Sequence, residues 1–295
     1  MINYKKIQPP ILILSPGRSG STLLQRILNT SKNICIWGEH NGFMKEISLS
    51  YHKILYSKEM SDFYYSRLTS INSSLITKSY TQYEENINWL NSFEKEKTKK
   101  LYKEFIFNIL NQNLKHSHNT KWGFKEIRYT ASDKTVKMFI DLFPDSKFIF
   151  PIRNPFDTIA SMMVAFYNAH DRDQAFLNND IDQIKTSINM FTKRILESYR
   201  SIYQWSTDNV MNSIIIHYED LINDKENTLK RIFQFLDEPI PPNALEPFKY
   251  RLENTGYYEF KGKLIDIIEK EKPSISEILE DYPQKLGYKD FERCC

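Results

Sequence analysis

An apolar segment followed by a glycine-containing turn near the N-terminus constrains this chain most. Residues 11–24 read I-L-I-L-S-P-G-R-S-G-S-T-L-L. The aliphatic run predicts a buried strand over Ile11–Ser15, as in parallel sheets, and the glycines allow a tight turn that approaches a ligand closely. A helix predicted over Thr22–Asn29 would direct its free N–H groups and its positive dipole end at an anion. The pattern therefore predicts a phosphate site made by Gly17, Arg18, Ser19, Gly20, Ser21 and Thr22.

The turn differs from the P-loop of nucleotide triphosphatases at one position. The P-loop pattern G-x-x-x-x-G-K-[ST] places a lysine before the final hydroxyl residue, whereas Ser21 stands between Gly20 and Thr22 here. The lysine that reaches the outer phosphates is therefore missing, and Arg18 would supply the positive charge from inside the turn. A nucleotide kinase or NTPase with a degenerate P-loop remains the alternative, as does a plain strand-to-helix turn with a solvated arginine.

Short apolar runs alternate with helical stretches along the chain, which predicts an α/β fold. We expect a P-loop-like central parallel sheet flanked by helices, with a helical insertion after the second strand at about residues 40–120. One domain over residues 1–295 would contain both. Further strands are expected at 34–37, 122–125, 147–152 and 213–217, and further helices at 132–143, 155–167, 181–208 and 227–236.

A second candidate anion site follows the strand expected at 147–152. Arg153 comes at the carboxyl end of this strand, Pro155 can start a helix, and Ser161 lies about two turns into that helix. A guanidinium fork suits a dianionic phosphate, and a hydroxyl adds a neutral donor. The alternative is that Arg153 pairs with Asp157 and that Ser161 only packs the helix.

Two charged residues lie at or just after the ends of other predicted strands, at the same edge of the sheet. Glu39, in W-G-E-H, could accept a proton from an attacking hydroxyl, although it could also cap a helix or pair with a lysine. Its neighbour His40 is a second candidate base. Lys125, in W-G-F-K, would either assist at the anion site or form an ordinary salt bridge.

Together these segments resemble the sulfotransferases that use 3′-phosphoadenosine-5′-phosphosulfate (PAPS), in the carbohydrate and tyrosylprotein branch and its bacterial relatives. The resemblance rests on P-G-R-S-G-S-T, G-E, W-x-x-K, I-R-N-P and Y-E-D-L, in that order along the chain. It implies that Arg18 and its turn bind the 5′-phosphosulfate, and that Arg153 and Ser161 bind the 3′-phosphate. It also implies that Tyr218 contacts the nucleotide.

The same resemblance implies a reaction. Glu39 would be the general base, with Arg18 and Lys125 as further catalytic residues. The acceptor would be a hydroxyl of a sugar, a glycolipid or a tyrosine, and no metal ion would be needed. A nucleotide-binding module without catalysis and a helical interaction protein remain as other interpretations.

Composition bears on which classes of partner the protein binds and on the compartment in which it works. Forty basic against 37 acidic residues leave a net charge of +3, which gives no support for a nucleic-acid partner. No apolar run approaches the roughly 20 residues of a membrane span. The first ten residues lack the apolar centre of a signal peptide, and the chain has only three cysteines. These features predict a cytoplasmic enzyme, with no signal for its oligomeric state.

Overall fold

The computed structural model divides the chain into two compact units. The smaller comprises Met1–Ile7, Phe43–His116 and Asp133–Pro144, and the larger comprises Gln8–Gly42, Ser117–Ser132 and Asp145–Cys295. Parts of the predicted insertion, at 63–92 and 113–120, and the terminal Cys294 and Cys295 lie outside the described residues. The structure describes residues 7–62, 93–112, 121–169, 181–208, 212–250 and 258–288.

The larger unit is built on a five-stranded sheet in which all neighbouring strands are parallel. Its strand order is β2-β3-β1-β4-β5. All five predicted strands are confirmed, with β1 one residue shorter and β3 one residue longer at each end. The strands are β1 (Ile11–Leu14), β2 (Ile34–Trp37), β3 (Lys121–Glu126), β4 (Lys147–Ile152) and β5 (Ser213–His217).

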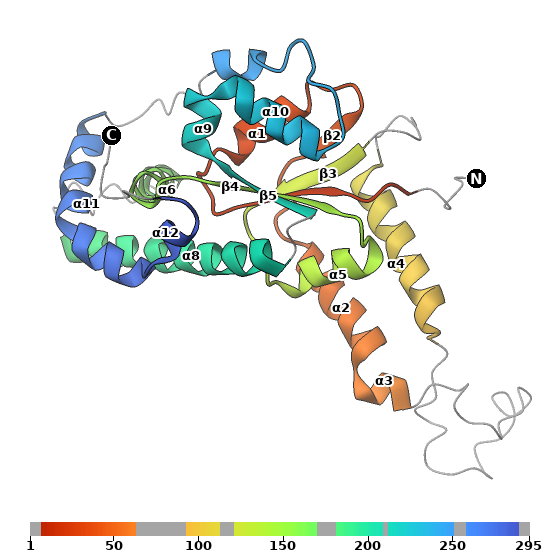
Figure 1. Cartoon of the computed structure of the whole chain (residues 1–295). Coiled ribbons are helices and arrows are strands. Elements are labelled where there is room, and N and C mark those ends of the chain that lie inside the picture. Colours follow the sequence, from red (N-terminus) through yellow and green to blue (C-terminus); the bar gives the residue numbers. More distant parts are fainter. Residues whose placement is uncertain are drawn as a thin grey trace, which may run out of the picture. The chain divides into compact units, whose positions relative to one another are not determined.

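Helices cover both faces of this sheet (Figure 1). One face carries α1 (Ser21–Leu28), α9 (Tyr218–Asn223) and α10 (Lys225–Phe235). The other carries α6 (Pro155–Ala169), α8 (Ile181–Asp208), α11 (Tyr258–Leu279) and α12 (Tyr282–Lys285). The larger unit also contains a 3-10 helix, η6 (Glu246–Lys249).

Side chains that alternate between the two faces of the sheet form a layer of the core on each face. Ile11 and Ile13 of β1 belong to a buried cluster with Leu24 of α1 and Phe233 of α10. On the other face, the ring of Phe148 lies 4.9 Å from that of Trp205 in α8. Successive strand residues point to opposite faces, so a run that is apolar throughout is buried between two helical layers.

The smaller unit is helical where the structure describes it. It contains α2 (Met44–Tyr56), α3 (Lys58–Asp62), α4 (Lys95–Leu110) and α5 (Lys134–Leu142). Asp141 of α5 accepts hydrogen bonds from Tyr51 and Tyr56 of α2 and forms an ion pair with Lys99 of α4. The helices after β2 confirm the predicted insertion, and the single domain over 1–295 remains a prediction.

The C-terminal part contains a long helix. Helix α11 begins at Tyr258 and contains Pro273. None of the helices within the described ranges is long and apolar enough to cross a membrane.

Candidate functional site

The carboxyl ends of the strands bring the predicted site residues to one edge of the sheet. In open α/β sheets this edge is where ligands bind. The glycine-containing turn follows β1, Glu39 follows β2, Lys125 lies at the end of β3 and Arg153 follows β4. Tyr218 begins the helix after β5. All of these residues belong to the larger unit.

The turn after β1 has the backbone of an anion site. Arg18 has a φ of 68°, and Gly20, the N-cap of α1, has a φ of 86°. Gly20 offers no side chain to cap the helix, and the N–H groups of a helical first turn are suited to an anion. The predicted strand, turn and helix are therefore present, with the helix beginning at Ser21.

Arg18 lies across this edge from Ser161 of α6. Its Nε donates a hydrogen bond to the Ser161 hydroxyl over 2.9 Å, so this serine does more than pack its helix. Burial, and after it the positive charge of Arg153, lower the pKa of Arg18. Two guanidinium groups close enough to repel one another give this edge a local positive charge that would suit an anion.

Arg153 combines an ion pair with an unsatisfied donor. Its guanidinium lies 3.6 Å from Asp157, as the alternative interpretation expected. Its Nε is nevertheless buried without a hydrogen-bond partner among the described residues, and the same holds for the hydroxyl of Ser19. Buried donors without an acceptor are costly, so these two atoms fit a site that takes phosphate groups.

Tyr218 links the two arginine-bearing segments. The guanidinium carbon of Arg153 lies 4.8 Å from the centre of the Tyr218 ring. On the turn side, a Cβ added to Gly20 would lie only 2.4 Å from the Cδ2 atom of this ring. Gly20 is therefore required both by its positive φ and by the ring packed against it.

Replacing Gly20 by alanine should lower the free energy of unfolding by about 1–3 kcal/mol, because the left-handed backbone is strained for alanine and the methyl group meets Tyr218. Urea unfolding measures this change. Gly38→Ala is the matched control, since its new Cβ would come no closer than 3.8 Å to another residue. Equal stability of the two variants would contradict the tight packing at the turn.

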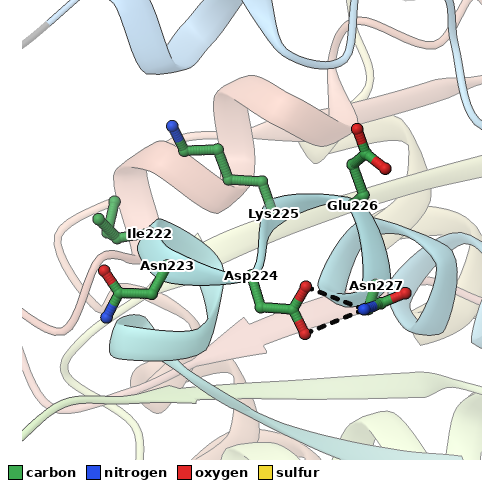
Figure 2. A pocket seen from close by; sticks show the side chains of 6 residues that line it. All are labelled: Ile222, Asn223, Asp224, Lys225, Glu226 and Asn227. Atoms are coloured by element: carbon green, nitrogen blue, oxygen red, sulfur yellow. Dashed lines mark hydrogen bonds between the residues drawn. The ribbon is translucent and has the colours of Figure 1, made fainter.

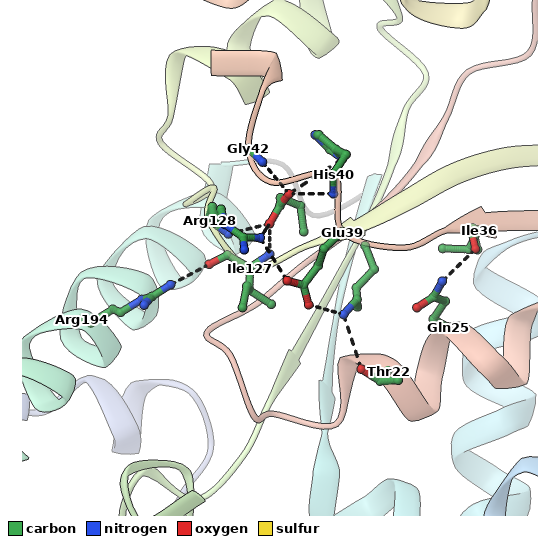
Figure 3. Close-up of polar contacts among 11 residues, drawn as sticks. Thr22, Gln25, Ile36, Glu39, His40, Gly42, Ile127, Arg128 and Arg194 are labelled. Carbon is green, nitrogen blue, oxygen red and sulfur yellow. Dashed lines mark hydrogen bonds and ion pairs between the residues drawn. The ribbon is translucent and has the colours of Figure 1, made fainter. Parts of the chain in front are cut away.

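Lys125 joins the turn to the predicted base. Its Nζ lies 2.5 Å from the Oε1 atom of Glu39 and 3.4 Å from the hydroxyl of Thr22, and the lysine side chain is buried. In Figure 3, dashed lines run from Thr22 and from Glu39 to one shared nitrogen. Glu39 thus pairs with a lysine, as one interpretation expected, and the same lysine places it beside the turn after β1.

Two further charged residues belong to this cluster, although the sequence did not single them out. Arg128 Nη1 lies 3.0 Å from Glu39 Oε2 and 2.7 Å from Glu126 Oε1. Glu126 is fully buried. The available signal was the segment K-E-I-R, in which a carboxylate directly follows Lys125 and an arginine comes two residues later.

His40, the second candidate base, is engaged by aromatic neighbours. Its Nε2 lies 2.8 Å from the Tyr129 hydroxyl, and its ring meets the edge of Phe124 at 4.7 Å between centres. Burial, more than any nearby charge, lowers the pKa of His40. The ring is therefore neutral at neutral pH, and it packs against Phe124 and Tyr129.

Other features of the described residues lie apart from this cluster. Within those ranges, no three His, Cys, Asp or Glu side chains gather closely enough to hold a metal ion. A shallow surface pocket is lined by residues 222–227 at the junction of α9 and α10, where Asp224 accepts two hydrogen bonds from Asn227 (Figure 2). None of the predicted site residues lines it.

Solved structures share the fold. The sulfotransferase domain from the curacin biosynthetic pathway aligns over 97% of this chain and 99% of its own, with 16% identity and a TM-score of 0.53. The sulfotransferase domain of the Synechococcus PCC 7002 olefin synthase aligns over 98% and 97%, with 17% identity and a TM-score of 0.52. Sulfotransferase STF9 from Mycobacterium avium aligns over 94% and 76%, with 12% identity and a TM-score of 0.51.

Sequence comparison identifies the family. No curated protein sequence matches the chain significantly. The sequence model of the sulfotransferase family matches residues 9–242, a range that includes the turn after β1, Glu39, Lys125 and Arg153. Since this match covers more than half of the chain, the protein belongs to the sulfotransferase family.

Proposed function

We propose that this sulfotransferase moves a sulfuryl group from PAPS to a hydroxyl acceptor, with Glu39 as the general base. One observation carries the proposal: the amine of Lys125 contacts both the Thr22 hydroxyl and the Glu39 carboxylate. A proton acceptor is thereby held beside a turn suited to phosphate. A nucleotide kinase would need the P-loop lysine, which the turn lacks.

Two groups of residues would hold PAPS. Arg18, Thr22 and the N–H groups at the start of α1 suit the 5′-phosphosulfate. Arg153 and Ser161 suit the 3′-phosphate, with Tyr218 beside the nucleotide. The unsatisfied Arg153 Nε and the repulsion between Arg18 and Arg153 support this assignment, because a phosphate would relieve both.

Each residue near the reacting atoms has a role in the proposed chemistry. When bound, PAPS would supply the sulfuryl group: the acceptor oxygen bonds to sulfur, the bond from sulfur to the 5′-phosphate oxygen breaks, and 3′-phosphoadenosine 5′-phosphate (PAP) leaves. Glu39 takes the acceptor proton. Arg18 and Lys125 offset the charge that develops on the phosphate oxygen. The proposal requires no metal ion.

The acceptor and the location are proposed from the resemblance and the composition. A hydroxyl of a sugar, a glycolipid or a tyrosine is the proposed acceptor, and no nucleic acid is proposed as a partner. The cytoplasmic location remains a prediction from the sequence.

PAP should raise the melting temperature of the protein more than AMP, ATP or NAD at equal concentration. A ligand that binds only the folded state stabilises it by about 2.7 kcal/mol at a hundred times its dissociation constant. The preference over AMP is expected because only PAP carries the 3′-phosphate that Arg153 and Ser161 would bind. Thermal denaturation with each nucleotide measures the shifts.

Arg153→Ala should remove the preference for PAP over AMP, while Arg200→Ala should keep it. Arg200 is the matched control because it is exposed on α8 and pairs with Glu280. Equal shifts with PAP and AMP in the unmodified protein would refute the 3′-phosphate site. A larger shift with ATP would favour a kinase, and no shift with any nucleotide would refute the proposed cofactor.

A further inference from the structure

The buried carboxylate of Glu126 fastens two segments of the site together. Its Oε1 accepts hydrogen bonds from the backbone N–H groups of Ile127 at 2.9 Å and Arg128 at 3.3 Å. Its Oε2 accepts from those of His40 at 3.2 Å and Gly42 at 3.0 Å. The residues that follow Glu39 are thus tied to the end of β3, and both oxygens of a fully buried acid are occupied.

Arg128 extends from this anchor to Glu39. A single nitrogen, Nη1, lies 2.7 Å from Glu126 Oε1 and 3.0 Å from Glu39 Oε2, and its two hydrogens allow it to donate to both. The turn at Gly42, where φ is 73°, packs against the stem of Arg128, since an added Cβ would lie 3.2 Å from the Arg128 Cδ. The bond to Glu126, with that to Glu39, raises the pKa of Arg128 and keeps it charged.

The two oxygens of Glu39 are held by different cations. Lys125 contacts Oε1 and Arg128 contacts Oε2. Lys125 also reaches the Thr22 hydroxyl, whereas Arg128 is fastened to Glu126 on its other side. In the proposed reaction Lys125 offsets the charge on the leaving phosphate. Arg128 is therefore the cation that remains paired with Glu39.

We infer that Arg128, anchored by Glu126, is a positioning residue that holds Glu39 toward the acceptor hydroxyl when Lys125 engages the phosphosulfate. The inference rests on the proposed function. Positioning of this kind matters because a displacement of about 1 Å in a reacting group can cost roughly a hundredfold in rate. Arg128 then acts through Glu39 and has no separate contact with the reacting atoms.

A double-mutant cycle tests this dependence. Arg128→Ala should lower kcat roughly 10- to 100-fold with little change in the KM for PAPS, and Arg128→Lys, which keeps a charged donor, should restore part of the rate. In the Glu39→Gln background, Arg128→Ala should have no further effect. The assay follows PAP release from PAPS with 4-nitrophenol, methyl glycosides or water as acceptor. Equal losses in both backgrounds would overturn the inference, as would an unchanged rate.

A second measurement needs no reaction and separates this inference from the proposed function. Urea unfolding of the same four proteins should show shifts in midpoint that do not add, because the two side chains are in contact. Additive shifts would refute the contact, whereas absence of a PAP shift in the unmodified protein would refute only the cofactor. Arg200→Ala is the control for both measurements and should leave kcat unchanged. If the alanine variant does not fold, the same two measurements are made on Arg128→Lys, in both the unmodified and the Glu39→Gln backgrounds.

Discussion

Glu39→Gln is expected to lower turnover by roughly 10²- to 10⁴-fold while leaving PAP binding nearly unchanged. Glutamine keeps the size of the side chain and one oxygen for Lys125 or Arg128, the two residues that contact Glu39. It cannot take a proton from the acceptor, so the loss falls on the chemical step. PAP formation from PAPS measures the rate, and the melting-temperature shift with PAP measures binding.

Glu197→Gln provides the comparison for this substitution, because Glu197 lies exposed on α8 and the chemical change is the same. It should leave both quantities unchanged. Unchanged turnover in Glu39→Gln would mean that another group takes the proton, and His40→Asn would then be the next variant. Loss of PAP binding along with turnover would instead assign Glu39 to the organisation of the phosphate site.

The sheet could be predicted because each strand is a short apolar run with a chemically distinctive residue at its end. Parallel strands buried on both faces need such runs, and the carboxyl ends of all five meet at one edge. The prediction that Arg18, Glu39, Lys125 and Arg153 lie at or after the ends of separate strands was therefore enough to gather them. The element ends shifted by one or two residues, as with α5, which begins at Lys134 behind the capping side chain of Asp133.

The contacts within the site could not be predicted in the same way. The sequence grouped Ser161 with Arg153, yet in the structure its hydroxyl accepts a hydrogen bond from Arg18. Side-chain partners at this edge depend on the paths of the connecting turns, which periodicity does not describe. Asn41 and Gly42 have φ values of 56° and 73°, and this left-handed turn carries the chain from Glu39 back to Glu126.

Glu126→Gln should cause the largest loss of stability among these variants, about 3 kcal/mol in the free energy of unfolding. The amide would direct an N–H group at backbone donors that now share a carboxylate, leaving some of them without an acceptor. The estimate is at the lower end of the range for broken buried ion pairs because Arg128, its cation, is partly exposed. Urea unfolding at neutral pH measures the change, with exposed Glu197→Gln as the control.

The same variant should alter the pH dependence of stability in a definite direction. Burial alone would raise the pKa of Glu126, but hydrogen bonds from Arg128 and from the Gly42 N–H, together with nearby positive charge, lower the pKa below its usual 4.5. Ionised Glu126 therefore stabilises the fold fully above about pH 4.5, and this contribution disappears as the pH falls through the lower folded value. The stability gap between the unmodified protein and Glu126→Gln should narrow in acid, since glutamine does not titrate. A gap that stays constant from neutral pH into acid would mean that the charge of Glu126 does not hold this edge of the sheet together.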